Sequence, residues 1–564
     1  MQGSERLLSL PLSAPSSQSL KEGAILVAAT WAAWRVLKAL TSSHPLDKVP
    51  GPRAESWFFG CMLQFFNPNA WDFHAEIAKK YPGITRLPSM QGDVMLHIDD
   101  PKALYHILVK DQNIFEESED FIRTNGLVFG PGLLATLGDH HRKQRKLLNP
   151  VFSIAHMREM IPTFYDVAYR LRDSFSKLVK DGPSEIDIAS WMTRTALELI
   201  GQSGLGTSFD SLQQGAAEHP FAASLKGLMQ GLSVIPFWRF VVLPKFDGIG
   251  SPRFRRWVVE RIPSKNIQKL VNMVDVMHNT SLEIYEKKKA ALAEDTGSHD
   301  EVGSRCKDII GILMRENMNA SGDERMPEHE VLGQMSTLMF AAMDTTSNAL
   351  CRILHLLSEN QHVQDRVRRE ILEAKEQAGG SDLSYDDLVQ LPYLDSVCRE
   401  TLRLYPPLPV VMRQARQDAI VPLSRPFTST DGKPTQQVLV PRGTQTIIGI
   451  MSCNRNPAIW GPDALEWKPE RWLNPLPDTV TSAKVPGIYS HLMTFIGGGR
   501  SCIGFKFSQL EMKVVLCCLL ESFKFTPTDK KITWLFNGVT QPAVMEPGST
   551  DVPHLQMPLN VSRL

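Results

Sequence analysis

The chain has 564 residues, of which 43% are hydrophobic and 22% are charged, a composition typical of a globular protein with a sizeable core. Lys plus Arg and Asp plus Glu both number 61, so the formal net charge is zero, and the chain lacks the basic excess of a nucleic-acid-binding protein. The 8 cysteines are scattered without a C-x-x-C pair, which argues against a disulfide framework and against a structural zinc site.

The N-terminal segment, residues 1–40, is predicted to carry a membrane anchor. Its apolar run begins with GAILVAATWAAW and makes a helix over about 23–40 if Arg35 and Lys38 snorkel. A cleaved signal peptide and a segment lying in the membrane interface are the alternatives. Basic residues are more frequent after this run than before it, so the positive-inside rule places the rest of the chain in the cytosol.

A polar, proline-rich linker, TSSHPLDKVPGPR, follows at residues 41–53, and its prolines make it stiff. No Gly/Ser tract or low-complexity spacer of linker length occurs later, so residues 54–564 are predicted to form a single large domain. Surface loops are expected at 291–305 and 425–436, where the sequence is polar and rich in turn-forming residues.

Helical patterns dominate this domain, and strand patterns are short. The longest helix, over 327–358, begins near a proline and continues without a breaker. Further helices are predicted over 361–377, 392–405 and 505–522. The fold class is therefore mainly α with small β-sheets, whose strands are expected at 94–98, 438–441, 444–450 and in the tail after Phe523.

The long helix carries the stretch FAAMDTTSN, in which Asp344 and Thr345 stand among apolar residues. An acid beside a hydroxyl in the middle of an apolar helix is suited to proton transfer. The same Asp-Thr-Thr sequence also occurs on solvated helix faces, so this stretch alone leaves both interpretations open.

The stretch FIGGGRSCIG, residues 495–504, places Cys502 in a glycine-rich turn ahead of a helix. A phosphate-binding loop is a weak interpretation, because a lysine would have to stand where Phe505 stands. A metal-binding thiolate explains the residues better, since backbone N–H groups, a helix N-terminus and the Arg500 cation all favour the anion. A buried free cysteine is the remaining alternative.

The spacing F-x-x-G-x-R-x-C-x-G resembles the haem-binding loop of the cytochrome P-450 family and is met here by Phe495, Gly498, Arg500, Cys502 and Gly504. The resemblance covers nearly the whole chain, and the motifs are most similar to those of fungal membrane-bound members. It implies the cytochrome P-450 fold, with one large haem-binding domain behind the anchor. It also implies haem b as the cofactor, Cys502 as the axial metal ligand and the loop as part of the haem site.

The resemblance assigns roles to residues outside the loop. Thr345 is expected to hold the reduced oxygen or a water, and Asp344 is expected to relay protons, although Ala342 replaces the family's usual glycine. Residues expected to bind the haem propionates are His141, in place of the usual tryptophan, Arg145 and Arg413.

A charged network and a basic segment also match the family. Glu400 and Arg403 are expected to join Arg471 in a buried network behind the haem. The segment GDHHRKQRKLLNPVF, residues 138–152, is basic, which indicates either a solvated face or a docking surface for an acidic electron donor.

The implied reaction is monooxygenation of a lipophilic small molecule, such as a terpenoid, steroid or fatty chain, with O2 as co-substrate. Electrons are expected from a separate NADPH-cytochrome P-450 reductase, with cytochrome b5 as a further possible donor. Pocket walls are expected from residues 121–134, from Phe340 and Met343, and from residues 408–412. The pathway would belong to secondary or lipid metabolism.

The expected location is the endoplasmic reticulum membrane, with a single-pass anchor and a cytosolic catalytic domain. The apolar segment 234–244 would either dip into the membrane or pack in the core. Two other functions stay open. One is a haem-thiolate isomerase or dehydratase that needs no reductase, against which Thr345 counts, and the other is a non-catalytic haem carrier or sensor.

Overall fold

The computed structural model describes residues 45–246, 248–295, 307–545 and 554–564, together with a few residues between 23 and 34. Most of the anchor predicted over 23–40 lies outside the described residues, so the anchor stays a prediction. Within the described ranges, no single helix has the length and apolar composition needed to cross a membrane. The helices Pro220–Ser233 and Trp238–Phe246, bent by 77° at their junction, meet that criterion only as a pair.

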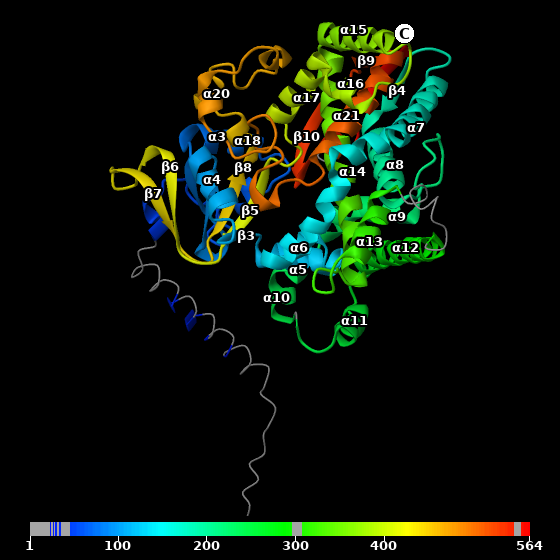
Figure 1. The fold of residues 1–564 in the computed structure, drawn as a ribbon. Helices are drawn as coiled ribbons and strands as arrows, with labels where there is room; N and C mark the ends of the chain where they lie inside the picture. The colour runs from blue at the N-terminus through cyan, green and yellow to red at the C-terminus, as the bar shows by residue number, and fades with distance from the viewer. Residues whose placement is uncertain are drawn as a thin grey trace, which may run out of the picture.

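The helical body is built around α14 (Glu328–Glu359), which packs against α8, α12, α17 and α21 (Figure 1). Pro327 has an extended backbone and starts this helix, and two glutamates in the first turn complement the helix dipole. The surrounding helices are α7 (Ile154–Leu178), α8 (Ile188–Leu205), α9 (Pro220–Ser233), α12 (Lys265–Asp295), α15 (Gln361–Gln377), α17 (Pro392–Leu404) and α21 (Phe505–Ser522).

Shorter helices flank this body and connect it to the sheets. Those that matter for the site are α5 (Glu119–Val128), α6 (Gly138–Leu148) and the π-helical turns η3 (His106–Lys110) and η6 (Trp238–Val242). The remaining α-helices are α2 (Met62–Phe65), α3 (Trp71–Lys80), α4 (Pro101–Tyr105), α10 (Leu243–Phe246), α11 (Pro252–Glu260), α13 (Ile309–Asn319), α16 (Tyr385–Val389), α18 (Ile450–Asn454), α19 (Pro457–Trp460) and α20 (Asp478–Ser482).

A five-stranded sheet with the order β1-β2-β8-β5-β3 stands beside the helical body, on the left of Figure 1. Only β2 and β8 run parallel, and the register of β5 on β8 sets Arg413 opposite Thr446. The strands are β1 (Ile84–Pro88), β2 (Val94–Ile98), β3 (Phe115–Glu116), β5 (Val410–Ala415) and β8 (Gln445–Gly449).

Three smaller sheets complete the fold. They pair β10 with β11, β6 with β7, and β12 between β4 and β9, so the C-terminal tail is tied back to the start of α8. The strands are β4 (Ser184–Asp187), β6 (Ala419–Thr428), β7 (Pro434–Val440), β9 (Phe523–Pro527), β10 (Ile532–Asn537), β11 (Val539–Val544) and β12 (Pro558–Arg563).

The structure confirms the mainly helical fold with small sheets and the four long helices. The loop expected at 425–436 is wrong in part, because β6 and β7 extend into it. Their pairing has a register irregularity between Pro422 and Phe427 and a turn between Thr428 and Pro434. The loop expected at 291–305 begins as helix, since α12 continues to Asp295.

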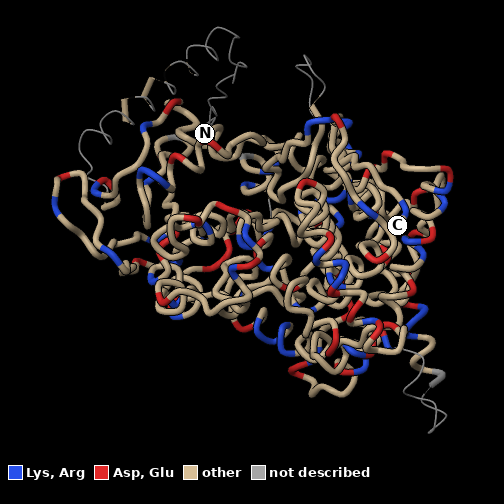
Figure 2. Tube along the Cα trace, turned by 90° about the horizontal axis from the view of Figure 1, so that it is seen from above, with Lys and Arg blue, Asp and Glu red and all other residues tan. Residues whose placement is uncertain are grey.

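Acidic and basic residues are intermingled along the trace (Figure 2), in keeping with the zero formal net charge. Helices α10 and α11 protrude below the helical body in Figure 1. Next to them, the side chains of Phe237 and Phe240 in the segment 234–244 are 61% and 48% exposed. This segment therefore does not pack into the core with all of its aromatic side chains.

Candidate active site

The stretch 495–504, here called the cysteine loop, is a main-chain turn closed by a hydrogen bond from the Cys502 amide to the Phe495 carbonyl at 3.0 Å. Gly498 adopts a φ of 78°, and a Cβ there would lie 1.8 Å from the carbonyl oxygen of Leu108 in η3. Only glycine fits this approach. The Gly499 amide also donates to Gln112 Oε1 at 2.8 Å, so the loop is fixed against the segment that follows η3.

Cys502 differs from the other cysteines that the structure describes, because those are buried and Cys502 is exposed. Its exposed surface lines a large cavity, and burial in the surrounding protein raises the pKa of the thiol. The Gly504 amide and the Arg145 charge act in the opposite direction. A thiol in this setting needs a bound cation to become a thiolate, since a coordinated thiol is deprotonated outright.

Three arginines line the cavity next to Cys502, and two of them share one carboxylate. Glu117, at the end of β3, forms ion pairs with Arg413 at 3.3 Å and with Arg500 at 3.1 Å. Arg145 donates instead to the Ser501 carbonyl at 2.6 Å. Within the described structure this cluster therefore keeps two positive charges without a carboxylate.

His141 lies on α6 beside these arginines, with 6% of its surface exposed. Burial, and then the charges of Arg500 and Arg145, lower its pKa to about 3. The imidazole is thus neutral at physiological pH and offers one N–H donor rather than a further charge.

Helix α14 presents Asp344 and Thr345 to the same cavity. Thr345 Oγ1 donates to the Ala341 carbonyl at 2.8 Å, one turn back in the helix. Burial raises the pKa of Asp344 to about 6, and the positive charge of Lys226 on α9 opposes that rise. The methyl group of Ala342 also lines the cavity, and α14 continues through this residue as regular helix.

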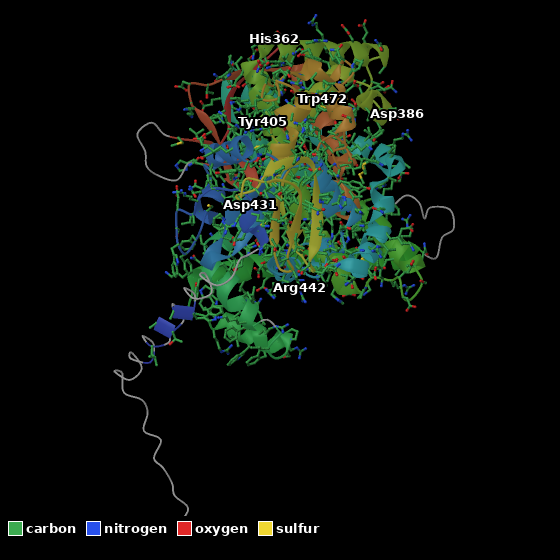
Figure 3. All side chains as sticks on the ribbon, turned by 90° about the vertical axis from the view of Figure 1, so that its left-hand side faces the viewer. His362, Asp386, Tyr405, Asp431, Arg442 and Trp472 are labelled. Atoms are coloured by element: carbon green, nitrogen blue, oxygen red, sulfur yellow. The ribbon has the colours of Figure 1, made fainter. Side chains whose placement is uncertain are left out.

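Behind the cysteine loop lies a buried charged network. Glu400 and Arg403 have no exposed side-chain surface and pair at 2.8 Å, and Arg471 approaches Glu400 at 3.4 Å. Trp472 adds an indole N–H donor to Glu400 at 2.9 Å, and its position is labelled in Figure 3. Arg403 also donates to the Asn454 carbonyl at 3.0 Å.

Asn454 connects that network to the cysteine loop. Its Oδ1 accepts the Met493 amide at 2.7 Å, and its Nδ2 donates to Thr494 Oγ1 at 2.9 Å. Met493 and Thr494 immediately precede Phe495. The network therefore fixes the entry to the loop.

Cys502, the three arginines, His141 and the α14 residues Asp344 and Thr345 all line one continuous cavity of about 3380 Å³, and the charged network lies outside it. Of the residues predicted to form the site, Gly498 alone does not line the cavity, because it packs on Leu108 behind the loop. The predicted pocket walls include one error, since Met343 is fully buried in the core rather than facing the cavity. The residues that do line it are His141, Arg145, Asp344, Thr345, Arg413, Phe495, Arg500, Cys502 and Gly504.

Two residues of the site escaped the sequence analysis. Glu117 balances part of the arginine charge, yet it stands in the acidic run EESED, whose members look alike in sequence. Gln112 holds the cysteine loop across 387 positions of sequence, and no local pattern reveals such a contact.

The residues present fit a haem group. Two unbalanced positive charges match the two propionates of protoporphyrin, and a thiol that opens to the cavity is available as an axial ligand. The glycine-rich loop also permits a flat ring to lie close to the backbone.

Comparison with known proteins agrees with this geometry. A sequence model described as cytochrome P450 matches residues 49–547. The chain belongs to the cytochrome P-450 family. A Postia placenta protein named cytochrome P-450 monooxygenase 91 is 50% identical over 524 residues, which cover 93% of this chain and 96% of that protein. A ganoderic acid synthetase of Ganoderma lucidum is 43% identical over 526 residues, covering 92% and 96% of the two chains.

A crystal structure of a cytochrome P-450 superposes with a TM-score of 0.68 and 20% sequence identity, covering 92% of this chain and 100% of that one, and shows the shared fold. As a cytochrome P-450 monooxygenase, the protein uses haem ligated by a cysteine thiolate. It requires O2, a small-molecule substrate and a redox partner.

Proposed function

We propose that this cytochrome P-450 binds haem b through Cys502 and oxidises a lipophilic molecule of secondary or lipid metabolism. The observation that carries the proposal is that a cysteine and an acid–hydroxyl pair line the same cavity. Cys502 opens into it, and Asp344 and Thr345 face it from α14. An axial ligand and a proton-transfer pair in one cavity is the arrangement that oxygen activation needs.

The cysteine loop would supply the sulfur ligand to the iron, and the arginine cluster would bind the propionates. Arg145, Arg413 and Arg500 supply the positive charge, and the neutral His141 supplies a further N–H donor. When bound, haem supplies the two-electron activation of O2 that leaves one oxygen atom in the substrate and the other in water.

The residues of α14 are proposed to deliver protons. Asp344, with a pKa of about 6, exchanges a proton near neutral pH, and Thr345 Oγ1 orients the proton acceptor or a water in the cavity. The apolar walls, which include Phe129 and Phe340 with ring centroids 4.8 Å apart, exclude bulk water from the reacting atoms.

Electrons are proposed to come from an NADPH-cytochrome P-450 reductase, with cytochrome b5 as a second donor. The outer side of α6 carries Arg142, Lys143 and Lys146, while Arg145 of the same helix reaches Ser501 beside Cys502. A basic surface so close to the axial ligand supports docking of an acidic electron donor. Charge reversal at Lys143 should raise the reductase concentration needed for half-maximal reduction, and unchanged dependence would contradict this role.

The protein is proposed to reside on the endoplasmic reticulum membrane, anchored by 23–40, with the linker 41–53 and the domain 54–564 on the cytosolic side. Exposed aromatic side chains near η6, α10 and α11 support a second contact with the bilayer: Phe237, Phe240, Phe246, Phe254 and Trp257. Deleting residues 1–40 should weaken sedimentation with microsomes. Sedimentation equal to that of the full chain would contradict the anchor.

A terpenoid or a fatty chain is the proposed substrate type, because the cavity walls are largely apolar, and a ganoderic acid synthetase among the relatives supports a role in secondary metabolism. The reaction is tested by reconstituting the full chain with reductase, NADPH and 18O2, and analysing products from a panel of terpenoids and fatty acids. The proposal predicts a product that carries one 18O atom and requires reductase. A product formed without O2 or reductase would indicate an isomerase, and haem binding without any product would indicate a carrier.

A further inference from the structure

Arg239 places a positive charge in the apolar part of the cavity. It lies on η6, and its side chain lines the same cavity as Cys502. Its Nε donates to Thr124 Oγ1 on α5 at 3.2 Å, and its guanidinium lies 4.8 Å from the ring centroid of Phe240. These two contacts hold the guanidinium in one place.

No carboxylate of the described chain lies within ion-pair distance of Arg239. Asp120 is the acid that acts on it electrostatically, and this aspartate pairs with Arg123 at 3.1 Å. The terminal Nη1 and Nη2 groups of Arg239 make no hydrogen bond to any residue that the structure describes, and Nε alone is engaged. Burial lowers the pKa of Arg239, because removing the charged guanidinium from water costs free energy.

The other cations of the cavity are accounted for. Arg145, Arg413 and Arg500 belong to the propionate cluster. Outside that cluster, two cations are paired with carboxylates: Arg86 with Asp47 at 3.2 Å and Lys226 with Glu218 at 2.8 Å. Arg442 is exposed to solvent at the end of the sheet (Figure 3). Arg239 is therefore the half-buried cation whose charge the described protein does not balance.

We infer that Arg239 binds the carboxylate of a lipophilic acid and thereby selects the substrate. The two terminal NH2 groups of the planar guanidinium are free in the described structure, and one N–H from each can donate to the two oxygens of a carboxylate. The Nε contact to Thr124 orients this fork in advance, so little side-chain entropy is lost on binding. The apolar body of the acid then lies along aromatic walls that include Phe129 and Phe340. This inference rests on the proposed function, because it defines the substrate of that same cavity.

The test compares acids with their uncharged esters on the full-length holoenzyme. The probes are hexadecanoic acid and a triterpenoid carboxylic acid, each beside its methyl ester. Dissociation constants are measured from the spin-state shift that follows displacement of the axial water, and again by equilibrium dialysis. At least one acid should bind roughly tenfold or more tightly than its ester, as expected for hydrogen bonds to a charged group.

Variants identify the residue responsible. Arg239→Gln should abolish the preference for acid while leaving ester binding within about twofold, and Arg239→Lys should retain part of the preference. Arg442→Gln, which removes an exposed cavity cation, is the matched control and should keep the preference. The inference is overturned if neither acid binds more tightly than its ester, which includes the case in which no probe binds. It is also overturned if Arg239→Gln retains the wild-type preference.

Failure of this inference is distinguishable from failure of the proposed function. All titrations use enzyme that shows the red-shifted Soret band of a ferrous–CO haem-thiolate. Loss of that band would contradict the role of Cys502. Equal binding of acid and ester by enzyme that has the band would contradict the role of Arg239 alone.

Discussion

The Cys502 amide donates a hydrogen bond to the Phe495 carbonyl at 3.0 Å, so main-chain contacts of the loop itself close the cysteine loop into a turn. Inside this turn, Gly498 has a φ of 78° and its Cα faces the Leu108 carbonyl of η3. The position of the axial sulfur thus depends on contact between two backbone segments that are far apart in sequence.

Gly498→Ala is predicted to remove most of the haem content. The added Cβ would lie 1.8 Å from the Leu108 oxygen, so the loop must move away from η3, and the positive φ adds strain. Haem content is measured by the pyridine haemochrome assay on purified protein.

Gly432→Ala is the matched control for this substitution. Gly432 has a φ of 80°, and a Cβ there would meet nothing within 4 Å. Because it shares the backbone strain without the collision, this variant should keep its haem and lose only about 1 kcal/mol of stability. Equal haem loss in both variants would show that backbone strain, and not the contact with Leu108, causes the loss of haem.

Glu400→Gln is predicted to lower the free energy of unfolding by about 3–5 kcal/mol, because it leaves Arg403 and Arg471 buried without their shared carboxylate. Urea unfolding of the holoenzyme, followed by tryptophan fluorescence, measures this change. Glu76→Gln breaks an exposed pair with Lys80 and should cost less than about 1 kcal/mol. Similar losses in the two variants would argue against a stabilising role for the buried network.

Asp344→Asn is predicted to change how stability depends on pH. Burial raises the pKa of Asp344 from 3.8 to about 6, so between these pH values the folded state binds more protons than the unfolded state. The contribution of Asp344 to the free energy of unfolding therefore falls as pH rises through this window. Asparagine does not titrate, so the variant should gain about 1–3 kcal/mol relative to wild type from pH 4 to pH 7. Parallel stability curves would contradict a raised pKa.

Thr345→Ala is predicted to keep the haem but divert electrons from product to hydrogen peroxide. The side chain faces the cavity and contacts only the Ala341 carbonyl among described groups, so its removal should leave the fold intact. Product formed per NADPH should fall roughly tenfold or more, as for the loss of a proton-transfer group. Thr345→Ser should restore most of the coupling, and unchanged coupling in the alanine variant would show that protons arrive by another route.

Many of the helices can be predicted from the sequence because the residues that begin and end them are local features of the chain. The prolines that start α14 and follow α17, and the glycines after α15, mark helix ends without reference to the rest of the chain. The sequence predicts only the end of β7, over 438–441, and does not predict β6. In these two strands the exposed positions are not reserved for polar residues, since Ile420 and Leu439 are 58% and 46% exposed, and the strands are stabilised by pairing across a turn.

The residues of the candidate site also fall into two groups, those that the sequence reveals and those that only the structure reveals. Cys502 and Thr345 stand in contiguous motifs, so their residue types and spacing suffice. The ion pairs of Glu117, and the close approach of the Leu108 carbonyl to Gly498, form only when segments hundreds of residues apart come together. The unpaired charge of Arg239 is likewise a property of the assembled cavity, because only the structure shows that Asp120, the acid that acts on it, forms its ion pair with Arg123 instead.

The ferrous–CO spectrum of Cys502→His beside that of wild type tests the central claim most directly. Histidine retains a ligand for iron but removes the sulfur, so a protein that still binds haem reports the identity of the axial atom. We predict that wild type has the red-shifted Soret band of thiolate ligation and that the variant, with haem present, lacks it. A variant that keeps the red-shifted band would contradict Cys502 as the ligand.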